Sequence, residues 1–295
     1  MKNLKRKITP LWFITPALVF LIFFVFGPLI QNLINSFYKF SAFSPTKEFV
    51  GTTNYEKLLQ DRTLPVALMN NFRYAVISVT VQVGFGLVLA AILENKIFRK
   101  IAPFFRVVYF MPVMISISVI AMLFSFIYNP QMGILNSALE LVGLGSLSKV
   151  WLGNPKTAIY SVIAMSQWQS TGYIMMLFIV SIQKIPKDLY EACMIDGAGN
   201  ISQFFNITVP QVKETIFINT LITITGSILV FNEPYILTKG GGPGISSITV
   251  ALHMYLEGFT RDNMGYASTL AVLIFVITAV VSIIQVLFSR TGKEE

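Results

Sequence analysis

Six long apolar runs constrain this chain more than any other feature of its sequence. They cover residues 11–33, 72–93, 107–128, 157–180, 216–237 and 266–288. A helix needs roughly 20 apolar residues to cross a hydrocarbon core about 30 Å thick, and each run has that length. Lipid offers no hydrogen-bond partner to the backbone, so spanning segments must be helical. The sequence therefore predicts an all-α integral membrane protein with six transmembrane helices.

The composition excludes an isolated soluble enzyme. Hydrophobic residues make up 54% of the chain and charged residues 12%, whereas soluble domains have about 45–50% and about 25%. The single Cys193 excludes an intramolecular disulfide, and with one histidine, His253, the usual zinc chemistry is not expected. We predict neither a catalytic nor a metal site. The net charge of +8 does not indicate nucleic-acid binding, because the basic residues lie between the apolar runs.

The basic residues predict the orientation of the spans. With the N-terminus inside, the cytoplasmic segments hold 13 Lys and Arg in 62 positions, against 8 in 94 positions outside. Cytoplasmic loops carry this kind of excess. We therefore expect both termini in the cytoplasm, with a tail at 1–10, one transmembrane domain at 11–289 and a second tail at 290–295.

The cytoplasmic loop 186–210 reads as two short helices around a tight turn. Pro186 suits a first helical turn, where its missing N–H is harmless. Gly197 permits the backbone angles of a turn, Asn200 is a candidate cap for the second helix, and Pro210 marks its expected end.

Each of these helices is predicted to have an apolar face. The first face holds Leu189, Ala192 and Cys193, and the second holds Ile201, Phe204 and Phe205. Apolar surface outside the lipid needs a cover. The sequence allows two surfaces against which these faces can pack: the chain's own membrane bundle, or a groove on another protein that receives a helix.

The loop resembles the EAA loop of ABC importer membrane subunits. The matching residues are Glu191-Ala192-Cys193-x-x-Asp196-Gly197-Ala198, followed after eight residues by Ile207-x-Val209-Pro210. Cys193 and Val209 stand where the family pattern has Ala and Leu. Further motifs are similar to the maltose-type sugar permease branch: Phe49-Val50-Gly51 with Asn54-Tyr55, Tyr109-Phe110-Met111-Pro112, and Thr238-Lys239-Gly240-Gly241-Gly242-Pro243.

The resemblance implies a type I importer permease in a prokaryotic cell membrane. Such a chain forms half of a pathway for a sugar or oligosaccharide that an extracytoplasmic binding protein delivers. The other implied partners are two copies of an ABC ATPase, a second homologous permease and membrane lipid. ATP and Mg belong to the ATPase, and this chain has no Gly-x-x-x-x-Gly-Lys-Ser/Thr sequence of its own. The implied coupling residues are Leu189, Glu191, Ala192, Cys193, Asp196, Gly197, Ala198, Phe204, Phe205, Ile207 and Pro210.

Polar side chains in the fourth and fifth runs are candidates for the substrate path. They are Gln169, Ser170, Tyr173, Ser227, Asn232 and Glu233. Small polar residues in spans also serve helix packing, which is the alternative for the Ser and Thr residues. An acidic group within a span usually faces a cavity or a partner, and Glu233 lies beside an expected kink at Pro234. Snorkelling of Glu233 to the membrane surface is the alternative reading.

Three other functions were weighed against the sugar permease. The same importer class with a different polar cargo, such as glycerol phosphate, is the nearest one. A secondary transporter or channel often has ionisable residues in its spans, and Glu233 alone gives it little support. A membrane enzyme needs a catalytic constellation, and neither His-Glu-x-x-His nor Gly-x-Ser-x-Gly occurs.

Overall fold

The computed structural model describes residues 13–44, 46–98 and 100–291. The tail 1–10, the first two residues of the first predicted span and residues 292–295 lie outside the described residues. Helices dominate the described part of the chain, which confirms the all-α class. The chain divides into two compact units. Unit 1 comprises residues 1–61 with 254–276, and unit 2 comprises residues 62–253 with 277–295.

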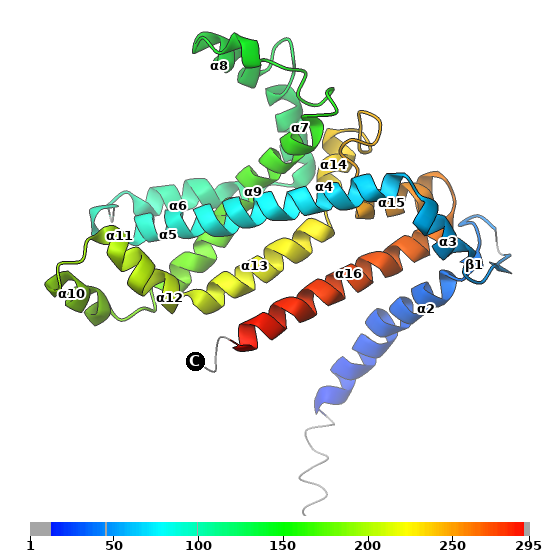
Figure 1. Cartoon of the computed structure of the whole chain (residues 1–295), viewed down its shortest axis with the longest axis horizontal. Helices are drawn as coiled ribbons and strands as arrows, with labels where there is room; N and C mark the ends of the chain where they lie inside the picture. The colour runs from blue at the N-terminus through cyan, green and yellow to red at the C-terminus, as the bar shows by residue number, and fades with distance from the viewer. Residues whose placement is uncertain (1–12, 45, 99, 292–295) are drawn as a thin grey trace, which may run out of the picture. The chain divides into compact units, whose positions relative to one another are not determined.

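Unit 1 contains an apolar helix, a short hairpin and the start of the last long helix (Figure 1). Its described elements are the helix Phe13–Asn35, including η1 (Ile22–Phe26) and α2 (Gly27–Asn35), then β1 (Tyr38–Lys39), β2 (Glu48–Phe49), α3 (Thr53–Gln60), η7 (Leu256–Thr260) and the first part of α16 (Met264–Thr291). The two strands are antiparallel, with Tyr38 opposite Phe49. The side-chain amide of Asn54 donates to the carbonyls of Ser36 and Tyr38 at 2.8 and 3.0 Å, which fixes α3 against the hairpin.

Unit 2 is a helical bundle. Its elements are α4 (Thr63–Ser78), η2 (Val79–Phe85), α5 (Gly86–Glu94), η3 (Lys96–Phe98), α6 (Ala102–Phe110), η4 (Met111–Met114), α7 (Ile117–Ile127), α8 (Ile134–Leu141), η5 (Gly145–Leu147), α9 (Ala158–Ile182), α10 (Lys187–Ile195), α11 (Asn200–Gln203), η6 (Phe204–Thr208), α12 (Val209–Gln211), α13 (Lys213–Ile228) and α14 (Asn232–Leu237). A further helix, α15 (Val250–Tyr255), begins at the end of the 62–253 segment.

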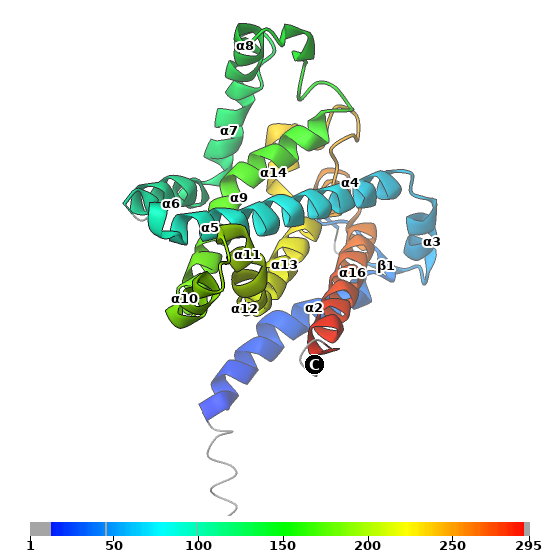
Figure 2. The same ribbon diagram turned by 60° about the vertical axis from the view of Figure 1, so that its left-hand side comes forward.

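Helix α9 is the centre of unit 2. It packs against α4, η2, α5, α6, α13 and α14, and its large apolar side chains Met165, Met175 and Phe178 are fully buried. In both ribbon views α7 and α8 project away from the layer of α4, α5, α9 and α13, while α10 to α12 lie beyond the other end of α9 (Figures 1 and 2).

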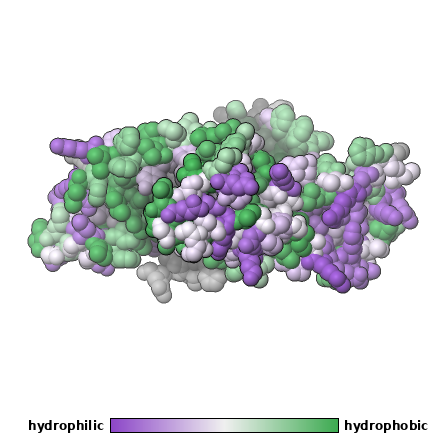
Figure 3. Space-filling view, turned by 90° about the horizontal axis from the view of Figure 1, so that it is seen from above, coloured by the Kyte–Doolittle hydropathy of each residue, from purple (hydrophilic) through white to green (hydrophobic). Residues whose placement is uncertain are grey.

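Three described helices are long and apolar enough to cross a membrane: Phe13–Asn35, Thr63–Glu94 and Met264–Leu287. The pair Ala102–Met114 and Ile117–Ile127 passes the same test together but is bent by 102°. Large apolar side chains are exposed along these helices, and green apolar residues cover wide areas of the face in Figure 3. The number of six spans and the orientation of the termini stay predictions.

The third predicted span is not the straight helix that its apolar run suggested. The helix α6 ends at Phe110, a short 3-10 turn follows, and α7 starts after Ser116. Pro112 lies in the first turn of that 3-10 segment and cannot donate a backbone hydrogen bond. The chain bends there, and the side-chain amide of Gln169 donates to the carbonyl of Ile115 at 3.4 Å.

The fifth predicted span is also broken. Helix α13 ends at Ile228 and α14 starts at Asn232, so the break precedes Pro234 rather than falling at it. The ring of a proline within a helix clashes with the carbonyl four residues earlier, and its missing N–H leaves that carbonyl without a partner. That carbonyl belongs to Val230, and it accepts the hydroxyl of Thr249 at 2.6 Å.

The helix that contains the second predicted span starts at Thr63, nine residues before the apolar run that begins at Phe72. Two asparagines in the added turns explain why this polar stretch stays inside the bundle. Asn70 donates to the carbonyls of Ser246 and Ile248, both at 2.9 Å. Asn71 donates to the carbonyls of Ser227 and Ile228 and accepts from the backbone N–H of Val250.

A close approach of α9 to α6 supplies a test of the packing. A Cβ at Gly172 in α9 would lie 1.7 Å from the carbonyl oxygen of Tyr109 in α6. Gly172→Ala should therefore destabilise the purified protein by about 3 kcal/mol, because the backbones must separate. The control Gly226→Ala in α13 meets nothing within 4 Å and should gain up to about 1 kcal/mol from helix propensity. Thermal unfolding in detergent measures both variants, and equal melting temperatures would contradict this packing.

Candidate coupling loop and substrate path

The predicted EAA loop folds as two short helical segments around a turn. Helix α10 starts after Pro186, and Gly197 adopts a left-handed φ of 79° that favours glycine. The predicted cap is wrong: Gly199 occupies the N-cap position, and Asn200 is already the first helical residue. Pro210 lies at the end of the second segment, as predicted. The helical run continues from Asn200 through η6 into α12 and ends at Gln211, one residue after Pro210.

One side of this loop packs inward on the bundle. Tyr190, Phe204, Ile207 and Val209 contact a buried apolar cluster formed mainly by α5 and α9. The hydroxyls of Tyr190 and Thr208 lie 2.9 Å apart, which ties the two segments together. The prediction that Phe204 and Phe205 share a face is therefore wrong, because Phe204 is half-buried against the bundle while Phe205 points outward.

The other side of the loop is uncovered in this chain. Ile195, Ile201 and Phe205 are 87, 77 and 62% exposed, and Leu189 is also exposed. Among the other predicted coupling residues, Glu191, Ala192, Asp196, Gly197 and Pro210 are exposed, whereas Cys193, Ala198 and Ile207 are half-buried. The loop thus presents an outward apolar face with acidic side chains beside it.

A polar contact at the base of this loop was missed by the sequence reasoning. Glu94, at the end of α5, forms an ion pair with Arg106 in α6 and accepts from the side-chain amide of Gln183 at 3.1 Å. It therefore joins the end of α5 to the middle of α6 and to the C-terminus of α9, beside the start of the loop. The sequence does contain a signal for this contact, because Glu94 is a single carboxylate that directly follows the long apolar run 72–93.

The candidate path residues of α9 lie on its less buried side. Gln169 and Ser170 are half-buried and Tyr173 is 40% exposed. Gln169 and Tyr173 are four residues apart, so they share one face of the helix. The amide of Gln169 also donates to the carbonyl of Ile115, which lies between the two helical parts at the bend of the third predicted span. This part of α9 thus presents a polar surface beside that bend.

The other path residues separate into two kinds. Ser227 is buried, and its hydroxyl donates to the carbonyl of Thr223 at 2.7 Å, which is a packing arrangement. Asn232 is exposed at the start of α14, and Glu233 beside it is half-buried. Sequence reasoning did not separate these environments.

A buried amide pair lies on the opposite side of α9. Gln167 accepts from Gln82 of η2 at 3.0 Å and donates to the hydroxyl of Ser78 at 3.0 Å. Its polar side chain lowers the mean hydropathy of α9 yet is fully satisfied inside the bundle. This explains why α9 lies at the centre of unit 2 although it is less apolar than the three candidate spans.

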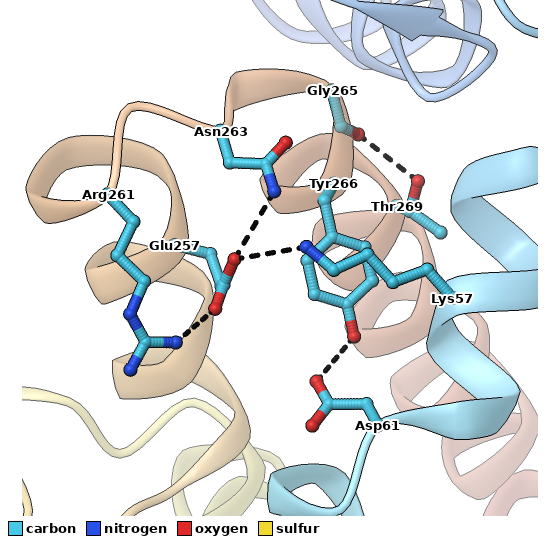
Figure 4. Close-up of polar contacts among 8 residues, drawn as sticks. All are labelled: Lys57, Asp61, Glu257, Arg261, Asn263, Gly265, Tyr266 and Thr269. Atoms are coloured by element: carbon cyan, nitrogen blue, oxygen red, sulfur yellow. Dashed lines mark hydrogen bonds and ion pairs between the residues drawn. The ribbon is translucent and has the colours of Figure 1, made fainter.

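Unit 1 contains a polar cluster around Glu257, which the sequence reasoning also missed (Figure 4). The carboxylate of Glu257 is buried, and it pairs with the ammonium of Lys57 at 3.5 Å and with Arg261. The Lys57 ammonium also lies 4.0 Å from the centre of the Tyr266 ring, whose hydroxyl donates to Asp61 at 2.5 Å. The cluster thus joins α3 to the start of α16.

Nothing in the described part of the chain groups three or more His, Cys, Asp or Glu side chains closely enough to hold a metal ion. The polar groups of the two regions above are amides, hydroxyls and single carboxylates. These groups suit hydrogen bonding to a polar solute and contact with a protein partner.

Comparison with solved structures shows that this chain has the fold of ABC importer permeases. A bacterial ABC transporter that imports the acidic polysaccharide alginate has a chain that superposes with a TM-score of 0.83, at 20% identity, over 98% of both chains. A structure of a bacterial alginate transporter in complex with its alginate pentasaccharide-bound periplasmic protein gives a TM-score of 0.84, at 20% identity, over 98% of this chain and 96% of that one. The fold of the described helices is the one these permeases share.

The family follows from the sequence comparisons. The model described as "Binding-protein-dependent transport system inner membrane component" matches residues 82–292. The probable ABC transporter permease protein YurN of Bacillus subtilis is 54% identical over 291 residues, covering 99% of each chain. The lactose transport system permease protein LacF of Rhizobium radiobacter is 30% identical, covering 95% of this chain and 94% of that one. The chain belongs to this family of inner membrane permeases. Because such permeases are not enzymes themselves, the prediction of no enzymatic activity is confirmed.

The Glu257 cluster supplies a second test. Glu257→Gln removes the charge that Lys57 and Arg261 share, and both cations keep access to water, so the loss should be about 1–2 kcal/mol. A loss of that size lowers the melting temperature by about 2–8 °C. The control is Glu56→Gln on the exposed side of α3, where we expect a change below about 0.5 kcal/mol. Equal melting temperatures for the two variants would show that the buried pairs are not stabilising.

Proposed function

We propose that this chain is one of two permease subunits of an ATP-driven importer and forms half of the path for a sugar or oligosaccharide. An extracytoplasmic binding protein delivers the cargo, and ATP with Mg²⁺ is hydrolysed on two copies of a separate ATPase. Both termini lie in the cytoplasm, and the six predicted runs span the membrane. The relative named for lactose transport and the structural neighbours from alginate importers support a carbohydrate cargo.

The single observation that carries the coupling role is the half-covered loop 186–210. Its inner residues Tyr190, Phe204 and Ile207 pack on the bundle, while Ile201 and Phe205 stay exposed. An apolar surface of this kind marks an interaction site. A partner bound to this apolar surface transmits its movement to α5 and α9, because the inner residues of the loop are packed against these two helices. The loop is therefore suited to transmit movement from the ATPase to the spans.

In this proposal the cargo passes the polar side of α9 and the start of α14. Gln169, Ser170 and Tyr173 offer hydrogen bonds and one aromatic ring, and Asn232 and Glu233 add an amide and a carboxylate. Ser227 is proposed only as a packing residue, since its hydroxyl is buried and paired.

The first experiment is gentle purification of the chain from its native membrane, followed by reconstitution into liposomes with the proteins that accompany it. We expect a P-loop ATPase, a second permease and a binding protein, and uptake of a radiolabelled sugar only when ATP and Mg²⁺ are inside. Testing mono- and oligosaccharides beside glycerol phosphate identifies the cargo class. Uptake by the chain alone without ATP would establish a secondary transporter instead.

The coupling role is tested by one double substitution. Ile201→Ser with Phe205→Ser removes the outward apolar face and leaves the inward residues in place. The ATPase should then be lost from the purified complex, with its dissociation constant raised at least tenfold, while the permease keeps its melting temperature. The control Leu141→Ser changes an equally exposed apolar residue of α8 and should retain the ATPase. Equal retention in both variants would overturn the assignment of the loop.

A further inference from the structure

Helix α13 carries several polar side chains, and two buried ones have no hydrogen-bond partner among the described residues. The hydroxyls of Thr220 and Ser227 donate to carbonyls four residues earlier, at 2.8 and 2.7 Å. Neither the side-chain amide of Asn219 nor the hydroxyl of Thr223 has a hydrogen-bond partner among the described residues. Asn219 is 0% exposed and Thr223 is also buried. Because they are four residues apart, the two lie on one face of the helix.

Asn219, Thr223 and Ser227 are buried, so they lie on the side of α13 that faces its neighbours, which are α4 and η2 of the continuous helix Thr63–Glu94 and also α9. Helix α13 and the continuous helix run in opposite directions (Figures 1 and 2). Asn71 binds the carbonyl of Ser227 near one end of this contact. Eight residues back along α13, about 12 Å of helix, Asn219 reaches the level of η2.

The segment η2 is one of four π-helical stretches among the described residues; the others are Ile22–Phe26, Phe204–Thr208 and Leu256–Thr260. Its residues Val79–Phe85 form a π-helical stretch within an otherwise α-helical element. π-helical turns are wider than α-helical turns and occur often at functional positions. When such a stretch changes between π and α pairing, its carbonyls change partners. A carbonyl released in this way is a hydrogen-bond acceptor for a neighbouring amide or hydroxyl.

The enclosure of Asn219 excludes water as its partner in this conformation. Its amide nitrogen and oxygen and the hydroxyl of Thr223 keep essentially no water-accessible surface. Burying polar groups without partners is unfavourable, and lipid around the bundle offers none. A leucine would fill a similar volume without that penalty. The polar side chains are thus mismatched to the packing arrangement seen here.

We propose that the contact between α13 and Val79–Phe85 has two arrangements, and that Asn219 and Thr223 gain hydrogen-bond partners only in the second one. In the present arrangement the polar side-chain atoms of Asn219 and Thr223 are inaccessible to water and have no hydrogen-bond partner among the described residues. In the second, the face of α13 shifts along η2 and the two side chains bind carbonyls of the π-helical stretch. This inference rests on the proposed function in one respect: the second arrangement belongs to the ATP-driven cycle.

The test compares the same substitution at two asparagines. Asn219→Leu removes the unpaired amide, so the complex should melt at a higher temperature than the wild type, and its ATP hydrolysis should fall at least tenfold. Asn71→Leu removes an amide with three hydrogen bonds and should lower the melting temperature. Thr223→Val is a near-isosteric second variant that should behave like Asn219→Leu with a smaller effect. The purified complex in nanodiscs, with ATP and Mg²⁺, is used throughout.

Two results would overturn the proposal. A lower melting temperature for both Asn219→Leu and Thr223→Val means that these groups are already paired. ATP hydrolysis within twofold of the wild type in both variants means that the second arrangement is not needed.

Hydrogen exchange of Val79–Phe85, measured with and without ATP and Mg²⁺, is a further test that needs no cargo. It should differ between the two conditions in the wild type and not in Asn219→Leu. A wild-type complex that hydrolyses ATP but imports no sugar refutes the proposed cargo and leaves this test valid.

Discussion

The need to pair every backbone carbonyl inside a bilayer shapes this structure more than any other constraint. Where a helix is broken, a side chain from elsewhere in the bundle supplies the missing hydrogen bond. Thr249 covers the carbonyl of Val230 before Pro234, and Gln169 covers that of Ile115 after Pro112. The side-chain amide of Asn71 likewise donates to the carbonyls of Ser227 and Ile228 at the end of α13. Polar residues that look out of place in apolar runs therefore allow the helices to bend and stop.

The same constraint distinguishes satisfied polar residues from functional ones. Gln167 has its partners in Gln82 and Ser78 and stabilises the packing of α9. Tyr173 and Asn232 face outward, where a solute or a second subunit can reach them. Asn219 fits neither group, because it is buried and lacks a partner in the described chain. Its environment, rather than its residue type, makes it the side chain that a conformational change would affect.

Sequence reasoning recovered the class of fold and the family, because the apolar runs and the spacing from Glu191 to Pro210 are local patterns. It also placed the turn at Gly197 correctly, since a left-handed backbone favours glycine. It failed where partners distant in sequence decide the outcome. The early start of α4 depends on carbonyls more than 150 residues away. The inward orientation of Phe204 depends on the position of the bundle beneath it.

By itself, the sequence determined that the chain is an all-helical membrane permease, because hydrophobicity and motif spacing are properties of short segments. Only the tertiary structure decided where the helices break, which side of the coupling loop is uncovered, and which polar side chains are paired. Proline removes a hydrogen bond wherever it stands, but the helix that supplies the replacement is chosen by packing. The roles of Glu257, Gln167 and Asn219 therefore emerge only when residues remote in sequence are brought into contact.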